Sequence, residues 1–298
     1  MTDSSSIRPN FVTVTQPWDV TDGRAASSGW QAHDRSFGLL NPVDLLLLAG
    51  VPIVLLGVFV LPLQVREQLV FEVTDPTVLD AYVSHYVHLD QSHLFGNLLV
   101  YALVGPVTYP LSVLSGCRWL FRRALLTFLL VFPLVLSGMQ QLFPRERILF
   151  GFSGINAALF GLLTFVLVSY VSTHLSSSID ESDAPALLFF MLSLITVIAV
   201  PSRAWMEEIT LVSVGISLIY VVALLLCVGV PDWRSIVDGW GGGRAEIALI
   251  GAGVLLLFPF VGFHQTFTGD GGVYDLYAHF LGYALAFIVM YIVTVIVD

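Results

Sequence analysis

The stretch LFGFSGINAALFGLLTFVLVSYV, residues 149–171, decides the fold. It is apolar along its length and exceeds the about 20 residues that an α-helix needs to cross a bilayer. Near its start lies Gly151-Phe152-Ser153-Gly154, a serine flanked by glycines. The first backbone N–H groups of a helix have no intrahelical partner and lie at the positive end of the helix dipole. The sequence therefore predicts a serine hydroxyl at a position where an oxyanion would be stabilised.

This motif alone has two interpretations. Small residues spaced along membrane helices usually serve helix packing. A serine also needs a base before it becomes a nucleophile. The rest of the chain must therefore supply a base at the same depth before the motif predicts chemistry.

The composition predicts an all-α polytopic membrane protein. Of 298 residues, 56% are hydrophobic and only 11% are charged, and the mean hydropathy is +0.86. A soluble protein carries about 25% charged residues. All twelve basic residues are arginines, and 22 acidic residues bring the net charge to −10. This balance argues against a nucleic-acid partner.

The polarity of the chain divides it into two parts. Residues 1–40 are polar and lack the apolar core of a signal peptide, so we expect a disordered cytoplasmic tail. Residues 41–298 form the membrane domain. Eight apolar spans are predicted within it: 43–63, 91–115, 123–143, 149–171, 185–201, 209–230, 245–263 and 274–297.

The arginines predict the orientation. With the N-terminus inside, eight arginines fall on the cytoplasmic side and four on the outer side, as the positive-inside rule requires. Both termini are then cytoplasmic. Ser153 lies at the outer end of its helix.

Seven histidines are candidate bases. His174 is expected in a solvated cytoplasmic loop. His279 lies inside the last span, where an ionisable group is costly and indicates function. Three predicted spans separate the serine helix from the histidine helix, so the two run in the same direction. Ser153 and His279 then share a depth near the outer face.

The second span carries two further polar groups at its outer end. His93 and Asn97 are four residues apart and share a helix face. Both can donate hydrogen bonds, and both would be costly facing lipid. One interpretation is that they stabilise an oxyanion. The alternative is that they are interfacial groups that bond each other or a loop.

Three motifs together resemble the rhomboid family of intramembrane serine proteases. They are His88-x4-His93-x3-Asn97, Gly151-x-Ser153-Gly154 two spans later, and Ala278-His279-x2-Gly282 in a late span. The resemblance covers residues 43–297 and implies a six-helix core, here with two extra helices. It implies that Ser153 is the nucleophile and His279 its base, and that His93 and Asn97 help to bind the oxyanion. It also implies transmembrane protein substrates in the lipid bilayer, and no metal or cofactor.

The chain departs from the family pattern in two further places. An aromatic residue commonly follows the serine by four positions and stacks on the catalytic imidazole, but here the position is Ala157. The first loop often carries a Trp-Arg pair. Residues 64–90 contain no tryptophan, so this loop must be anchored otherwise.

Elementary chemistry gives the same mechanism. After His279 takes its proton, Ser153 would attack a peptide carbonyl, and water would hydrolyse the acyl-enzyme. Asn97, His93 and backbone N–H groups of the Gly151–Gly154 turn would hold the developing charge. Small residues would let the two helices touch; these are Gly154, Gly161 and Gly282. A polar cavity must admit water from the outer face.

Two other classes of protein remain as alternatives. A catalytically silent relative would bind membrane segments without cutting them. A metal site would use His85, His88, His93 and Asp90, although no His-Glu-x-x-His is present. Asp275 adds an open question within the protease interpretation: it either orients His279, four residues later, or caps the last helix.

Overall fold

In the computed structural model, the described residues are 41–142, 148–176, 178–199, 242–262 and 276–297, with isolated positions between 208 and 222. The predicted tail, most of the predicted span 209–230, His264 and Asp275 lie outside these residues. The described part is almost entirely helical, as predicted.

Six helical segments of the described residues are long and apolar enough to cross a membrane. The prediction of an all-α polytopic membrane protein is thereby confirmed. The predicted number of eight spans is not reached in the described part, which has six, or seven if one bent pair is a single span. The six segments are α2 (Pro42–Phe59), α5 (Gln91–Leu114), α8 (Ser153–His174), Glu181–Ile198 with α9 (Ala184–Ala199), α12 (Arg244–Gly262) and Leu276–Val295 with α13 (Leu276–Tyr291).

The bent pair corrects the third predicted span. It begins at Arg118 rather than at residue 123, and it consists of α6 (Arg118–Leu130) and α7 (Phe132–Gln140), which meet at 47°. Pro133 follows the break and has no N–H, so the carbonyl of Leu129 loses its helical donor. The hydroxyls of Tyr82 and Tyr86 donate to that carbonyl instead.

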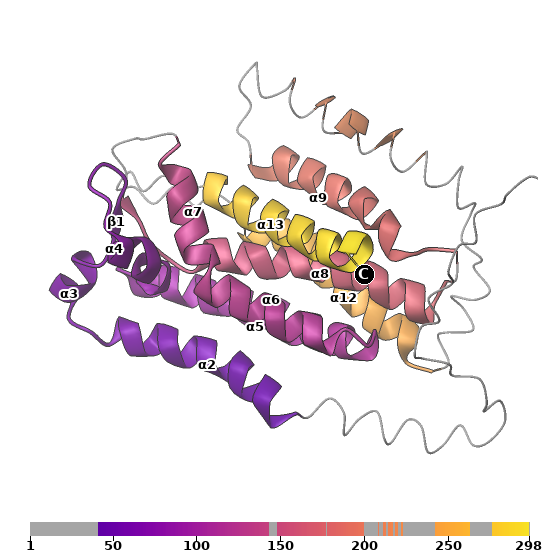
Figure 1. Ribbon diagram of the computed structural model, residues 1–298, viewed down its shortest axis with the longest axis horizontal. Helices are drawn as coiled ribbons and strands as arrows, with labels where there is room; N and C mark the ends of the chain where they lie inside the picture. The colour runs from indigo at the N-terminus through magenta and orange to yellow at the C-terminus, as the bar shows by residue number, and fades with distance from the viewer. Residues whose placement is uncertain are drawn as a thin grey trace, which may run out of the picture.

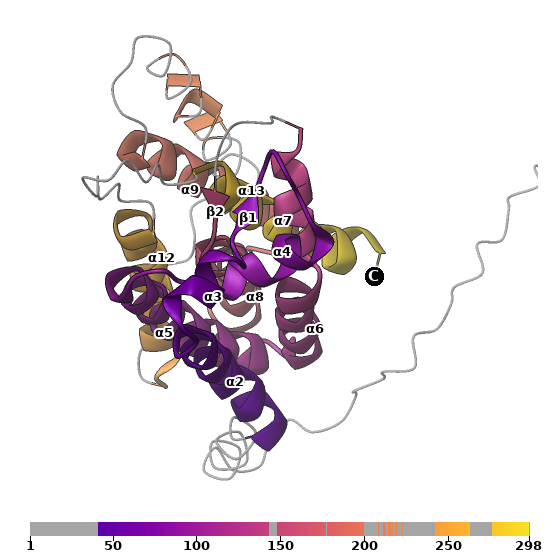
Figure 2. The same cartoon turned by 90° about the vertical axis from the view of Figure 1, so that its left-hand side faces the viewer.

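Helix α8 is the centre of the bundle. Within its membrane window 94% of the residues are buried, because the helix is apolar on all sides. Helices α5, α12 and α13 pack directly on it. Figures 1 and 2 show α8 enclosed by these helices, with α2 at the edge of the bundle.

The connection between α2 and α5 covers one end of the bundle, which we call the loop end. It contains α3 (Leu63–Glu67), β1 (Phe71–Glu72), α4 (Val78–Val83) and the 3₁₀-helix η1 (Ser84–Tyr86). Strand β1 pairs antiparallel with β2 (Ile148–Leu149), with Phe71 opposite Leu149. Because this pairing takes up the start of the predicted serine span, α8 begins only at Ser153. The opposite end, where α2 and α6 begin, is called the arginine end.

The loop is anchored by an arginine. The buried Arg66 donates from Nε to the carbonyl of Leu61 at 3.1 Å and from its terminal nitrogen to the carbonyls of His88 and Leu89. Its guanidinium lies 4.3 Å from the ring centroid of Phe59. A cation over an aromatic ring thus ties the loop to α2 where residues 64–90 have no tryptophan.

Candidate functional site

Ser153 is the first residue of α8, as the motif predicts. Phe152 precedes it as N-cap and makes no side-chain capping bond, so the backbone N–H groups of the first turn face outward from the helix start. The turn is held from the loop end by two bonds. Gly151 N–H donates to the carbonyl of Ser84 at 3.0 Å, and Phe152 N–H points to Nε2 of His88 at 3.5 Å.

Gly151 must be glycine for two reasons. Its φ of +104° is a conformation that side chains rarely allow. A Cβ at this position would also lie 2.5 Å from Cε1 and 2.7 Å from Nε2 of His93. The imidazole of His93 therefore lies directly over the backbone of the turn, two residues before Ser153.

His279 lies on α13 and is only 2% exposed. Helix α13 approaches α8 closely next to Ser153 and His279. One turn after His279, a Cβ at Gly282 would overlap the carbonyl oxygen of Gly154, and next to Ser153 a Cβ at Gly154 would lie 3.8 Å from the carbonyl oxygen of Ala278. The neighbours of Ser153 and His279 in the chain are therefore in contact.

The contact between α8 and α13 continues along both helices. A Cβ at Gly161 would overlap the carbonyl oxygen of Tyr283. The hydroxyl of Tyr283 lies 3.3 Å from that of Thr164, and its ring lies 4.9 Å from that of Phe160. Two turns of glycine-mediated contact hold the helices in register at the level of Ser153.

Ala157 lies in the same contact. Its Cβ is 3.4 Å from the position that a Cβ on Gly282 would take, and its side chain is buried. An aromatic ring at this position would need the space that the backbone of α13 occupies. His279 is therefore held in a place of close helix packing.

Asn97 is buried and faces α8. Its Nδ2 donates to the carbonyl of His93 at 3.1 Å, one turn back on α5. Asn156 on α8 donates from Nδ2 to the carbonyl of Asn97 at 3.0 Å and to its Oδ1 at 3.2 Å. Asn156, three residues after Ser153 and 1% exposed, was missed in the sequence analysis. An amide in the middle of an apolar span was the signal that pointed to it.

A small cavity of about 40 Å³ opens beside Ser153. Its polar lining includes His85, Ser137 and Gln140, from η1 and α7, which the sequence analysis did not assign to the site. Nε2 of His85 lies 3.0 Å from the hydroxyl of Ser137, which donates to the carbonyl of Ala81 at 2.8 Å. Residues of η1 and α7, which lie about 50 positions apart in the sequence, thus meet beside Ser153.

Two histidines of the loop are neutral at physiological pH. Burial lowers the pKa of His85 to about 4, and burial together with the neighbouring His93 lowers the pKa of His88 to about 3. A neutral His88 can accept the N–H of Phe152, whereas a protonated one cannot.

Acidification is therefore expected to destabilise the protein. Between pH 6.5, the ordinary histidine pKa, and the lowered folded values, the unfolded chain binds more protons than the folded chain, so the free energy of unfolding falls as pH falls. Each such histidine contributes about 1.4 kcal/mol per pH unit at most. Thermal unfolding of the purified protein between pH 7.5 and 5 measures this slope. The slope should be shallower in His88→Gln, whose amide oxygen still accepts; equal slopes in both proteins would contradict the assignment.

The remaining histidine and metal predictions have these outcomes. His174 is the last residue of α8 rather than part of a solvated loop, and its Nε2 lies 2.9 Å from the carbonyl of Leu114. Asp90 caps α5 by accepting the N–H of His93 at 2.8 Å. Across the part of the chain that the structure describes, no three His, Cys, Asp or Glu side chains are placed to hold a metal ion.

Comparisons with protein-family models, curated proteins and solved structures found no match to this chain. Its function must therefore be argued from its own residues.

Proposed function

We propose that this polytopic membrane protein is an intramembrane serine endopeptidase of the rhomboid type, with Ser153 as nucleophile and His279 as general base. The proposal rests on the close approach of Gly282 to the backbone of Gly154. This contact brings α13, which carries His279, against the start of α8, where Ser153 lies. The substrates would be transmembrane or juxtamembrane segments of other membrane proteins. The reaction would need no metal or cofactor.

The first step would be attack by the hydroxyl of Ser153 on a peptide carbonyl as His279 takes its proton. The carbonyl oxygen becomes an anion at the start of α8. Two kinds of donor would stabilise it there: the backbone N–H groups of Ser153 and Gly154 at the helix start, and the side chains of His93 and Asn97. The cavity next to Ser153, with the polar side chains of His85, Ser137 and Gln140 in its lining, would hold the water that hydrolyses the acyl-enzyme.

A fluorophosphonate probe tests the nucleophile directly, because it forms a covalent bond with an activated serine. We expect labelling of Ser153 in the wild-type protein and none in Ser153→Ala. A catalytically silent relative would give no labelling in either protein and would not cut any single-span substrate. Chelator-sensitive cleavage without labelling would favour the metal alternative.

Asn97→Ala is expected to lower turnover about a hundredfold, since an oxyanion donor contributes about 3 kcal/mol. The KM should change little, because the charge appears only in the transition state. Asn156→Ala should give a smaller loss, of about tenfold, because Asn156 acts through the orientation of Asn97. Cleavage of a reconstituted single-span substrate measures both values. Unchanged turnover in the double variant Asn97→Ala/His93→Ala would remove α5 from the mechanism.

The topology would place the site near the outer face, with both termini in the cytoplasm. This orientation rests on the arginine distribution along the sequence.

A further inference from the structure

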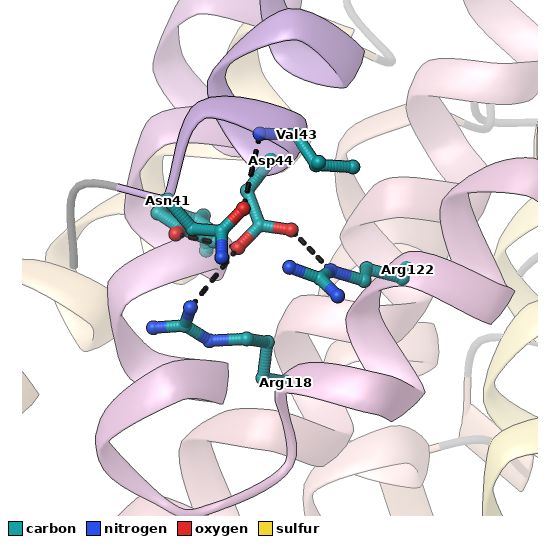
Figure 3. A network of polar contacts seen from close by, with 6 residues as sticks. Asn41, Val43, Asp44, Arg118 and Arg122 are labelled. Carbon is teal, nitrogen blue, oxygen red and sulfur yellow. Dashed lines mark hydrogen bonds and ion pairs between the residues drawn. The ribbon is translucent and has the colours of Figure 1, made fainter. Parts of the chain in front are cut away.

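The arginine end of the bundle carries an ion cluster with an excess of positive charge. Asp44, in the first turn of α2, is fully buried and pairs with Arg122 and, at 3.5 Å, with Arg118 at the start of α6. The hydroxyl of Tyr109 donates to the same carboxylate at 2.8 Å. Figure 3 shows the carboxylate of Asp44 between the two guanidinium groups. Among the residues that the structure describes, two guanidinium groups share this one carboxylate, so these ion pairs leave one positive charge in excess.

The guanidinium of Arg122 is available for a further acceptor. It meets Asp44 through Nε, which is one of its five N–H donors, and its side chain is 34% exposed. Arg123 adds another exposed positive charge on the neighbouring face of α6, where its guanidinium lies 4.8 Å from the ring of Trp119. Tryptophan and arginine together are typical of the level of lipid headgroups.

An apolar groove lies on the loop side of this cluster, between α2 on one wall and α4, η1 and Leu129 of α6 on the other. It has a volume of about 440 Å³ and is lined along α2 by a helical stripe of Leu47, Val51, Val54 and Val58. Asp44 is the first member of the same stripe, three residues before Leu47. The groove therefore begins one turn from the ion cluster.

The far end of the groove is closed by the tyrosines that cap the broken helix. Tyr82 and Tyr86 line it together with Leu129, whose carbonyl both hydroxyls bind. Leu129 lies two turns after Arg122 on the same face of α6. The groove thus runs along α2 from about one turn after Asp44 to the tyrosines of the loop end.

The dimensions favour an acyl chain as occupant. From Leu47 to Val58 the α2 wall is about 16 Å long, which is about half of a 30 Å hydrocarbon core and so the depth of one leaflet. A transmembrane helix about 10 Å wide would fill the volume of the groove with about one turn. The groove is therefore too small for a helix, and its length suits a chain of one leaflet.

We propose that this groove binds one acyl chain of an anionic phospholipid, whose phosphate is held by Arg122 and Arg118. The phosphate accepts hydrogen bonds from the guanidinium fork, which matches its geometry. The bound chain fills the space between α2 and the wall formed by α4, η1 and Leu129, and thereby stabilises the position of α2 at the edge of the bundle. This inference concerns a groove that shares no lining residue with the cavity at Ser153, and it does not depend on the proposed protease activity.

Native mass spectrometry of the full chain in detergent tests the site, with phosphatidylglycerol and phosphatidylcholine of identical chains as probes. We expect phosphatidylglycerol to bind at least about fivefold more tightly, which corresponds to about 1 kcal/mol for one arginine contact. Asp44→Asn/Arg122→Gln should remove this preference without leaving a buried unpaired carboxylate. Asp44→Asn alone keeps both arginines and should retain it. Arg244→Gln, at the exposed start of α12, is the control for a general effect of charge.

Two glycines of α2 test the apolar part independently of the ion cluster. Gly50 lines the groove and a Cβ there meets nothing within 4 Å, so Gly50→Phe should fill the groove and lower the affinity for both lipids at least about tenfold. Gly57 is equally open but does not line the groove, so Gly57→Phe should leave binding unchanged. Equal binding of the two lipids by the wild type, or equal effects of Gly50→Phe and Gly57→Phe, would overturn the proposal. If Gly50→Phe blocked a transmembrane peptide and not a lipid, the groove would instead belong to a helix.

Discussion

Ser153→Ala and His279→Ala are each expected to reduce cleavage of a single-span substrate by at least about a thousandfold. The hydroxyl and the imidazole act as a unit, so the loss of either should cost nearly as much as the loss of both. Initial rates in proteoliposomes, with mapping of the cut bond, measure the effect. The double variant should be no slower than the slower single variant within error.

The controls for these variants are a buried serine and a histidine outside the site. Ser112 on α5 bonds only the carbonyl of Thr108 in its own helix at 2.8 Å, so Ser112→Ala should keep activity within about twofold. His174→Ala, at the far end of α8, should also cleave the substrate. A Ser153→Ala protein that still cut the same bond would contradict the assignment of Ser153 as the nucleophile.

Gly282→Ala should have the second largest effect. Its Cβ would lie closer to the carbonyl oxygen of Gly154 than the 3.0 Å that real Cβ atoms keep, and a backbone oxygen cannot rotate away. Helix α13 must therefore move off α8 and carry His279 with it. A displacement of about 1 Å at a catalytic group costs about a hundredfold in rate. We expect a loss of that size in turnover, together with a lower melting temperature from the looser helix packing.

Gly253→Ala is the matched control for this variant. Gly253 lies on α12 and a Cβ there meets nothing within 4 Å, so the change adds a methyl group to a transmembrane helix without moving a neighbour. It should leave turnover and melting temperature unchanged. If Gly282→Ala retained full activity, the contact with Gly154 would not be what positions the two reacting groups.

Several features of the fold followed from the sequence alone. The length of the apolar segments located the membrane helices, because a helix needs about 20 apolar residues to cross a bilayer, whichever helices it packs against. Glycine and helix-end chemistry placed Ser153 at the first position of α8. His279 was singled out because it is an ionisable side chain in an apolar span. The free-energy cost of placing such a side chain in a membrane can be judged from the local sequence.

The start of the fourth predicted span and the break within the third were not predicted. Residues 148–149 are apolar enough for a helix, yet they pair with β1, which lies far away in the sequence. Pro133 was visible, but a proline signals a break without saying which way the following helix turns. The direction of α7 is decided by the tyrosines of the loop, which bind the carbonyl that the proline releases.

The sequence by itself determined that the protein is a helical membrane protein, the approximate place of the described membrane helices and the polar residues within them, because hydropathy and the cost of buried polar groups are local properties. Only the tertiary structure decided which of these residues meet. Asn156 binds Asn97, His93 covers Gly151, and His85 with Ser137 lines the cavity at Ser153 through contacts between helices that the chain does not place side by side. Such contacts depend on how each helix is rotated about its axis and on the distance between two packed helices. The small residues of both helices set these quantities together, so the sequence of one helix alone does not give them.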